Sequence, residues 1–269
     1  MQTSNPQIVK LDQFHQQLDH FDVVIDVRSP AEFALDHIPG ALNYPVLNNE
    51  ERAQIGTLYK QESPFAAKKL GAALVSRNIA GHLENHFLEF PREWRPLIYC
   101  WRGGERSGAF THILNRIGWK ARQLEGGYQG FRRLVIDDLG LYAKQFSFHV
   151  ICGMTGSGKT RVLRELKTLG AQVLDLEGLA VHRGSVLGNE PQVDQPSQKG
   201  FETALWNALR TLDPSRPVYV ESESKKVGGV HVPDALMEKI RQGSCIELRS
   251  STATRVSWLI REYHHFLID

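Results

Sequence analysis

Short runs of mostly apolar residues alternate along the chain with longer segments whose apolar residues recur every three or four positions. The first kind is typical of buried strands, and the second is typical of helices that bury one face. In the first half, strands are expected at 22–28, 95–100 and 121–127, and a helix is expected at 107–118. Strands that alternate with helices in this way indicate βαβ units, so the pattern predicts an α/β fold with a parallel sheet.

A second α/β series begins at Phe146, after a polar, helix-like stretch at 139–145. Its expected strands are 146–153, 172–176, 217–221 and 244–249, with helices from Lys159, Gly200 and Asp234. We therefore predict two domains, 1–142 and 143–269. The last segment, 252–269, is expected to be a helix without a C-terminal capping signal, so the second domain is expected to be incomplete at its C-terminus.

The composition agrees with two globular domains. The chain has 269 residues, of which 41% are hydrophobic and 23% are charged. This length and apolar fraction are typical of two folded domains rather than of a disordered chain. No apolar run approaches the roughly 18 residues of a membrane span, so no membrane association is expected. Three cysteines, an odd number, argue against a disulfide framework and favour a reducing cytoplasm.

Cys100 stands at the end of an apolar strand and before a helix, with a glycine-containing loop between them. Backbone N–H groups converge at such a place, which stabilises a thiolate or binds an anion. The loop residues are Trp101, Arg102, Gly103, Gly104, Glu105, Arg106 and Ser107. The sequence predicts a nucleophile assisted by Arg102 and Arg106, and the alternative is a buried, inert cysteine.

Residues 22–45, with Asp26, Arg28 and the segment His37–Ala41, resemble the signature of the rhodanese family. With Cys100 and residues 124–127, the resemblance spans nearly the whole first domain. It implies a rhodanese-like fold whose loop cysteine carries sulfur or selenium as a persulfide or perselenide. We expect His37 to be structural rather than a catalytic base.

The spacing Cys-x5-Arg, from Cys100 to Arg106, is one residue longer than the usual sulfur-carrying loop. It resembles the loop of rhodanese-fold dual-specificity phosphatases, which cradles a tetrahedral phosphate. Two alternatives follow. The site either cleaves phosphate esters or accepts a donor that itself carries phosphate, such as selenophosphate.

An insertion of about 48 residues, at 46–93, interrupts the rhodanese-like pattern. Gly71 lies inside its expected helix, where glycine costs about 1 kcal/mol relative to alanine. Either close helix packing or the close approach of a ligand would account for this glycine, and the sequence does not choose between them.

The second domain opens with a phosphate-binding motif after a strand and at the start of a helix, which is the context of a P-loop. Its residues are Gly153, Met154, Thr155, Gly156, Ser157, Gly158, Lys159 and Thr160. Lys159 is expected to reach phosphate oxygens, and Thr160 can bind Mg²⁺. The candidate Mg²⁺ or diphosphate partners are Asp175, Glu221 and Glu223, but none makes a clear Walker B motif. We therefore expect a polyphosphate or diphosphate site with weak ATPase chemistry and no tightly bound metal.

The combination of these two domains resembles the tRNA 2-selenouridine synthase family. Matching segments are 48–61, 100–107, 153–160, 175–188, 195–202 and 220–228. The resemblance implies replacement of sulfur in wobble 2-thiouridine of tRNA by selenium from selenophosphate. It also implies an S-geranyl intermediate made from geranyl diphosphate, and as partners the tRNA anticodon loop and an enzyme that supplies selenophosphate. It implies that Cys100 carries the chalcogen or acts beside it, that Gly71 supports the site, and that the P-loop binds the geranyl donor. The alternative is a sulfurtransferase or phosphatase with an NTP-binding regulatory domain.

The net charge of +2 is unevenly distributed. Residues 92–133 contain nine basic and three acidic residues. Five aromatic residues are interleaved with these basic residues: Trp94, Trp101, Trp119, Tyr128 and Phe131. Aromatic faces can stack unpaired bases, so the segment predicts a salt-sensitive RNA surface around the Cys100 loop. The alternative is a solvated face with core aromatics.

Cys152 and Cys245 are expected to be core residues.

Overall fold

The computed structural model describes residues 8–14, 20–183 and 193–262. It divides into two compact units, Met1–Leu134 and Val135–Asp269. The predicted segment 175–188 is therefore described as far as Arg183, and the predicted C-terminal helix as far as Glu262. The remainder of both segments lies outside the described residues.

The first unit contains a five-stranded parallel sheet in the order β1-β5-β4-β2-β3. The strands are β1 (Ile8–Val9), β2 (Val23–Asp26), β3 (Leu42–Asn43), β4 (Pro96–Tyr99) and β5 (Arg122–Leu124). All four residues of β4 are buried, as expected for a central strand covered on both faces. This confirms the predicted α/β class and places the carboxyl end of β4 at the middle of one sheet edge.

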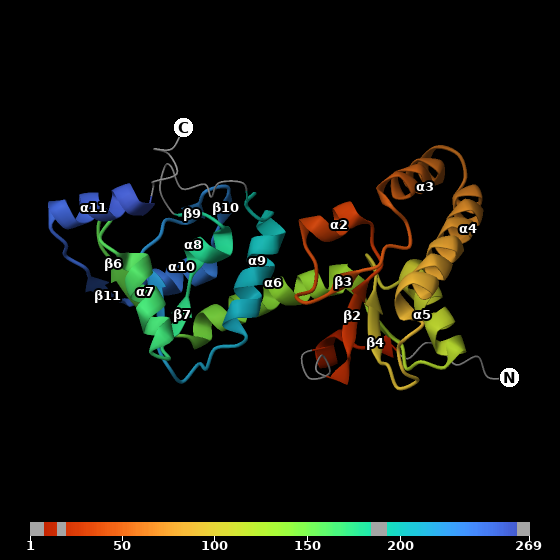
Figure 1. The fold of residues 1–269 in the computed structure, drawn as a ribbon, viewed down its shortest axis with the longest axis horizontal. Coiled ribbons are helices and arrows are strands. Elements are labelled where there is room, and N and C mark those ends of the chain that lie inside the picture. The colour runs from red at the N-terminus through yellow and green to blue at the C-terminus, as the bar shows by residue number, and fades with distance from the viewer. Residues whose placement is uncertain (1–7, 15–19, 184–192, 263–269) are drawn as a thin grey trace. The chain divides into compact units, whose positions relative to one another are not determined.

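Helices cover this sheet (Figure 1). They are η1 (Leu11–Gln13), α2 (Pro30–Leu35), α3 (Asn49–Gln61), α4 (Pro64–His82), the π-helical turn η3 (Leu83–Phe87), α5 (Glu105–Ile117) and α6 (Gly127–Gln145). The insertion folds mainly into α3 and α4, which pack against each other. Asn48 and Glu51 form a capping box at α3, and Ser63 with Pro64 starts α4. Local capping therefore fixes where both helices begin.

The second unit has a four-stranded parallel sheet in the order β11-β6-β8-β7. Its strands are β6 (Phe148–Cys152), β7 (Gln172–Leu174), β8 (Val218–Glu221) and β11 (Ser244–Glu247), and β9 (Lys226–Val227) pairs with β10 (Val230–His231) as an antiparallel ribbon. The helices are α7 (Lys159–Thr168), α8 (Leu176–Ala180), α9 (Gln198–Leu209), α10 (Asp234–Arg241) and α11 (Thr252–Glu262). The second α/β series is thus confirmed.

Cys152 and Cys245 are not core residues, which makes that prediction wrong. All four residues of the edge strand β11 are exposed, including Cys245, and Cys152 is half-buried. The structure pairs these two cysteines as a disulfide between neighbouring strands, with Cα atoms 6.1 Å apart. The cysteine count gave no sign of this pair. Cys100 is the free cysteine among the described residues, and it is buried.

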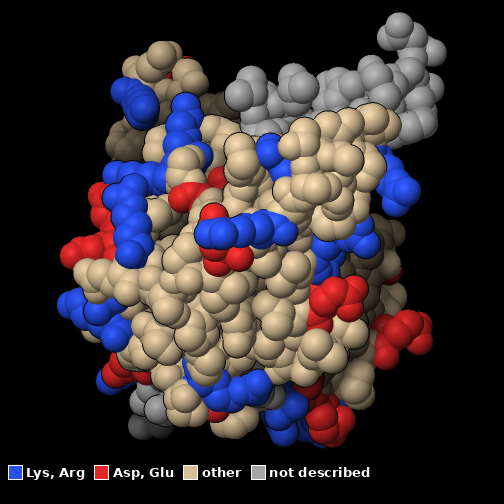
Figure 2. Space-filling model, turned by 90° about the vertical axis from the view of Figure 1, so that its left-hand side faces the viewer, with Lys and Arg blue, Asp and Glu red and all other residues tan. Residues whose placement is uncertain are grey.

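Charge differs between the units. Residues 135–269 contain 16 basic and 16 acidic residues, so the net charge of +2 belongs to the first unit. On the face of the second unit shown in Figure 2, Lys and Arg side chains are interspersed with Asp and Glu side chains. Within the described residues, no helix is both long and apolar enough to cross a membrane.

Candidate active sites

Cys100 follows the last residue of β4 and precedes the loop that leads into α5. Its exposed fraction is 3%, so the thiol lies at the bottom of the loop. The Ser107 hydroxyl Oγ donates a hydrogen bond to Cys100 Sγ at 3.1 Å. Ser107 itself is fully buried. A hydroxyl donor aimed at sulfur is a contact that an activated nucleophile uses, so this pair fits a nucleophile better than an inert core cysteine.

Gln123, in the neighbouring strand β5, holds the Cys100 loop closed. Its amide Nε2 lies 2.5 Å from the Gly103 carbonyl oxygen, 3.1 Å from the Gly104 carbonyl oxygen and 2.9 Å from Ser107 Oγ. Gln123 is buried, and no motif in the sequence singles it out. Sequence reasoning missed this residue, because its role depends on the pairing of β5 with β4, which the sequence does not show.

Two glycines let the β5–α6 turn pack against the Cys100 loop. Gly103 has φ +64°, and a Cβ atom there would lie 2.6 Å from the Leu124 carbonyl oxygen. Gly127 has φ +52°, and a Cβ atom there would collide with the Cys100 carbonyl oxygen. Tyr128 N donates to that same oxygen at 2.8 Å. Only glycine permits both the left-handed conformation and the close approach at these positions.

The two arginines predicted to assist Cys100 are both engaged. Arg106 Nη1 lies 3.0 Å from Glu32 Oε2 in α2, and Arg52 Nε lies 3.8 Å from the same oxygen. Burial raises the pKa of Glu32, but the hydrogen bond and charge of Arg106 outweigh it, so the pKa lies below its ordinary value. Arg102 Nε donates to Gln129 Oε1 at 3.1 Å in an exposed position. An anion in the loop would therefore compete with Glu32 for Arg106.

Asp26 and Arg28 support the Cys100 loop indirectly, through Tyr128 at the start of α6. Both are buried, and Arg28 Nη2 lies 2.6 Å from Asp26 Oδ2 and 2.7 Å from the Asp36 carbonyl oxygen. The Arg28 guanidinium lies 4.0 Å from the centre of the Tyr128 ring, and the Tyr128 hydroxyl donates to Asp36 at 2.8 Å. This buried ion pair fixes the start of α6 and, through Tyr128, the Cys100 carbonyl.

Gly71 and His37 each have a packing neighbour outside the Cys100 loop. A Cβ atom at Gly71 would lie 3.8 Å from Ile55 Cδ1 in α3, an ordinary packing distance. His37 is stacked on Phe33 with ring centres 3.8 Å apart, and its Nδ1 lies 3.0 Å from the Phe33 carbonyl oxygen. His37 is thus tied to its own turn, as a structural residue would be.

The predicted stacking surface is wrong for four of its five aromatic residues. Trp94, Trp119, Tyr128 and Phe131 are buried, and the two tryptophans pack edge to face with ring centres 5.3 Å apart. Trp101 alone is partly exposed among the five. These side chains fill the core of the first unit because they lie on the inner faces of α5, α6 and their connections, which the spacing of bases along the sequence does not report.

The P-loop, Gly153–Thr160, connects β6 to α7 and lines a cavity of about 820 Å³. Lys159 Nζ donates to the Gly153 carbonyl oxygen at 3.1 Å, across the loop. Ser157 is buried and lines the cavity, and its Oγ has no hydrogen-bond partner among the described residues. A buried hydroxyl without a partner at a helix N-terminus suits a ligand with acceptor oxygens.

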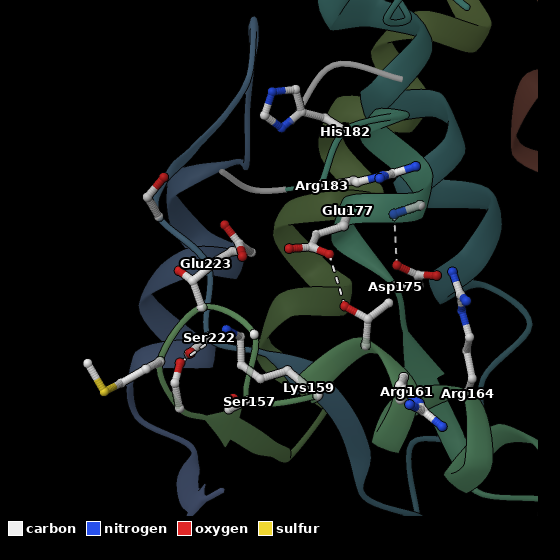
Figure 3. A pocket seen from close by; sticks show the side chains of 18 of the residues that line it. Ser157, Lys159, Arg161, Arg164, Asp175, Glu177, His182, Arg183, Ser222 and Glu223 are labelled. Atoms are coloured by element: carbon white, nitrogen blue, oxygen red, sulfur yellow. Dashed lines mark hydrogen bonds between the residues drawn. The ribbon is translucent and has the colours of Figure 1, made fainter. Parts of the chain in front are cut away.

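Glu177 and Glu223 reach toward one another in this cavity (Figure 3). Thr160 Oγ1 donates to Glu177 Oε2 at 3.1 Å. Burial first, and then the hydrogen bond and charge of Glu177, raise the pKa of Glu223 to about 7. Glu223 therefore titrates near neutral pH. Glu177 was not among the predicted residues, although it stands two positions after the candidate Asp175.

Glu221 and Asp175, two predicted partners of the phosphate site, have structural contacts of their own. Glu221 is buried, accepts a hydrogen bond from Glu177 N at 2.8 Å, and leaves Oε2 without a partner among the described residues. Burial is the main cause that raises the pKa of Glu221 to about 8. Asp175 caps α8 by accepting from Gly178 N at 2.7 Å.

Helix α11 packs on the outside of the P-loop. A Cβ atom at Gly158 would lie 2.5 Å from Trp258 Cζ3, and Arg255 Nε donates to the Thr155 carbonyl oxygen at 3.0 Å. The residues the structure describes contain no cluster of three or more metal-binding side chains. Thr160 and Glu177 fit Mg²⁺ only if phosphate oxygens supply further ligands.

Family comparisons match both halves of the chain and define its class. Residues 10–134 match the model of the rhodanese-like domain, and residues 146–268 match that of the tRNA 2-selenouridine synthase AAA domain. The chain is thus a rhodanese-like domain joined to a P-loop domain.

Curated relatives extend over most of the chain. The tRNA 2-selenouridine synthase of Nitrosomonas europaea is 39% identical over 89% of this chain and 63% of its own length. That of Alcanivorax borkumensis is 37% identical over 89% and 66%. That of Bdellovibrio bacteriovorus is 35% identical over 95% and 68%. The chain belongs to the tRNA 2-selenouridine synthase family, as the sequence motifs predict, and it spans 63–68% of the length of these relatives.

Proposed function

We propose that this protein converts wobble 2-thiouridine of tRNA to 2-selenouridine, with selenophosphate as the selenium donor. The observation that carries the proposal is the occurrence in one chain of a loop cysteine with a hydroxyl donor at 3.1 Å and an intact P-loop lining an 820 Å³ cavity. Family membership supports tRNA as the substrate.

In this proposal the Cys100 loop binds selenophosphate. The loop ends at the N-terminus of α5, a helix of 13 residues, where backbone N–H groups favour an anion. Arg106 turns from Glu32 to the phosphate, and Arg102 adds charge at the rim. Cys100 then acts as the nucleophile at the donor.

The P-loop binds the diphosphate of geranyl diphosphate. Lys159 and the backbone N–H groups neutralise the diphosphate, and Ser157 Oγ gains the acceptor that it lacks. The raised pKa of Glu223 and the lack of a clear Walker B motif favour binding over NTP hydrolysis. Geranylation has a chemical purpose, because geranylthiol leaves the base more readily than a thiocarbonyl sulfur does.

We place the tRNA on helix α4. From Pro64 to His82 this helix has three basic residues and no acidic residue. Lys68, Lys69 and Arg77 are all exposed, with the small exposed residues Ala72 and Ala73 between them. Such a surface lets an RNA backbone approach closely while phosphates meet cations.

Two contacts support this placement. One connects the surface to the Cys100 loop, and the other places a cation beside an exposed aromatic ring. Lys68 Nζ lies 3.5 Å from Glu105 Oε1, at the start of α5. Phe65 is 69% exposed, with Lys69 Nζ 5.0 Å from its ring centre. An exposed ring beside a cation suits base stacking better than the buried aromatics of residues 92–133 do. The reaction belongs in the cytoplasm, beside the enzyme that supplies selenophosphate.

The test is nucleoside mass spectrometry of tRNA incubated with the protein, geranyl diphosphate and selenophosphate. The expected product is 2-selenouridine. Cys100→Ser should accumulate S-geranyl-2-thiouridine, and Lys159→Ala should leave 2-thiouridine unchanged. Selenium incorporation by Cys100→Ser would overturn the assignment of Cys100.

The Cys-x5-Arg spacing also favours a second candidate, a phosphatase or sulfurtransferase. Its test is hydrolysis of phenyl phosphate and formation of thiocyanate from thiosulfate and cyanide. Rapid turnover of either compound, without modified tRNA, would favour this candidate.

A further inference from the structure

Selenophosphate offers a thiolate two atoms to attack, selenium and phosphorus. Attack on selenium would form an S–Se bond, and phosphorus would keep the electron pair of the broken P–Se bond. That step reduces phosphorus to the level of phosphite, or else it needs an oxidant. Attack on phosphorus forms an S–P bond, and the electron pair leaves with selenium. The second step is redox-neutral and needs no co-reactant.

The surroundings of Cys100 suit attack on phosphorus. A loop of five residues separates Cys100 from Arg106, and Ser107 follows directly. Ser107 Oγ donates to Cys100 Sγ at 3.1 Å, and Gln123 holds Ser107 Oγ from its other side at 2.9 Å. A cysteine whose sulfur accepts from a hydroxyl, six positions before an arginine in the sequence, can both attack a phosphoryl group and leave it again.

Arg106 can contribute in the same way. It is held by Glu32 at 3.0 Å in the absence of substrate, with a side-chain exposed fraction of 17%. A partly buried guanidinium at the rim of the loop can donate two hydrogen bonds at once to the equatorial phosphoryl oxygens.

We propose that Cys100 Sγ attacks the phosphorus of selenophosphate, which gives S-phosphocysteine and releases hydrogen selenide anion beside the tRNA base. This inference rests on the proposed function. The selenide anion attacks C2 of the S-geranylated base, and geranylthiolate leaves. Water then hydrolyses the S–P bond, which returns the Cys100 thiolate and releases phosphate and a proton. Geranylthiolate takes up this proton. All atoms and electrons balance without an oxidant.

Ser107 acts mainly in the second step, because its hydrogen bond to Cys100 Sγ stabilises the thiolate as it leaves phosphorus. Loss of a hydrogen bond to a charged group costs about 1.5–3 kcal/mol, which corresponds to a roughly 10- to 100-fold slower hydrolysis. Ser107→Ala should therefore accumulate the phosphocysteine. Ser76→Ala is a matched control, because it removes the same hydroxyl group from an exposed position on α4.

The experiment incubates the full chain with tRNA containing 2-thiouridine, geranyl diphosphate, and selenophosphate labelled with either ³²P or ⁷⁵Se. The reaction is quenched, and the label on the Cys100 peptide is located. The inference predicts ³²P without ⁷⁵Se on this peptide in the wild type. It predicts at least fivefold more ³²P in Ser107→Ala, wild-type amounts in Ser76→Ala, and none in Cys100→Ser.

Bound ⁷⁵Se without ³²P on the wild-type peptide would overturn the inference. This arm needs no variant, so it decides the question even if Ser107→Ala fails to fold. Nucleosides from the same reactions are analysed in parallel. If the wild type forms 2-selenouridine and ⁷⁵Se is bound to Cys100, only this inference is refuted. If no 2-selenouridine forms, the proposed function is refuted.

Discussion

Replacing Gln123 with leucine should separate the accessibility of Cys100 from its catalytic use. The amide Nε2 of Gln123 has two protons and three acceptors within 3.1 Å: the Gly103 and Gly104 carbonyl oxygens and Ser107 Oγ. Leucine has a similar volume but no polar atom, so it keeps the packing against β4 and removes every one of these bonds.

The magnitude follows from the number of bonds and the burial. Two lost hydrogen bonds at about 1 kcal/mol each predict a loss of about 2 kcal/mol in the free energy of unfolding, and more if a carbonyl remains buried without a partner. The same energy favours local opening of the loop. Since each 1.4 kcal/mol is a factor of ten, Cys100 should be alkylated roughly 10- to 100-fold faster.

The assays are urea unfolding and the rate of iodoacetamide alkylation of Cys100, followed by peptide mass spectrometry. Selenium transfer should fall while alkylation rises, because Ser107 loses its orientation. Asn115→Leu is the matched control. Asn115 Nδ2 also holds one backbone oxygen, that of Ala121 at 3.0 Å, but lies away from the loop. It should cost about 1 kcal/mol and leave alkylation unchanged. Equal alkylation of Gln123→Leu and wild type would refute the role assigned to Gln123.

Three further predictions concern other parts of the chain. The pKa of Glu221 is raised to about 8 in the folded state, so the stability of the second unit should fall as the pH rises from about 4.5 to 8. Glu221→Gln should remove up to about 5 kcal/mol of this dependence, measured as urea midpoints across pH, and an unchanged slope would contradict the assignment. Gly71→Ala should raise the thermal midpoint, with a gain of about 1 kcal/mol and full activity, because the new methyl group meets Ile55 at 3.8 Å; a loss of activity at unchanged stability would instead place a ligand there. Changing the three α4 cations, Lys68, Lys69 and Arg77, to glutamine should weaken tRNA binding and reduce the salt dependence of the binding constant by a slope of about 2. The same change at three basic residues outside α4 should not.

The sequence predicts β2, β4, β6 and β8 because these strands are largely apolar and buried. It also predicts β11, although all four residues of that strand are exposed. The P-loop and the Cys100 loop are also predictable, since phosphate binding and thiolate chemistry need glycines and bases at fixed spacing. Gln123 and Glu177 are different. Their roles depend on which strand lies beside β4 and which turn faces Thr160, and neither relation has a local pattern in the sequence.

The aromatic residues show the opposite failure. Trp94 and Trp119 alternate with bases along the chain, and this spacing suggested a nucleic-acid surface. The fold buries both rings against Phe87 and the β4 layer, and the neighbouring bases point outward without them. In α4 the exposed Phe65 is adjacent to lysines in space as well as in sequence. Burial, which decides between these cases, becomes visible only in the structure.

The central claim is that this chain geranylates and then selenates the same uridine. An order-of-addition experiment tests it most directly. The protein is incubated with tRNA containing 2-thiouridine and with geranyl diphosphate, freed of excess geranyl diphosphate, and then given selenophosphate, with nucleosides measured at each step. We predict S-geranyl-2-thiouridine after the first step and its conversion to 2-selenouridine after the second. Formation of 2-selenouridine in a parallel reaction that never received geranyl diphosphate would contradict the account.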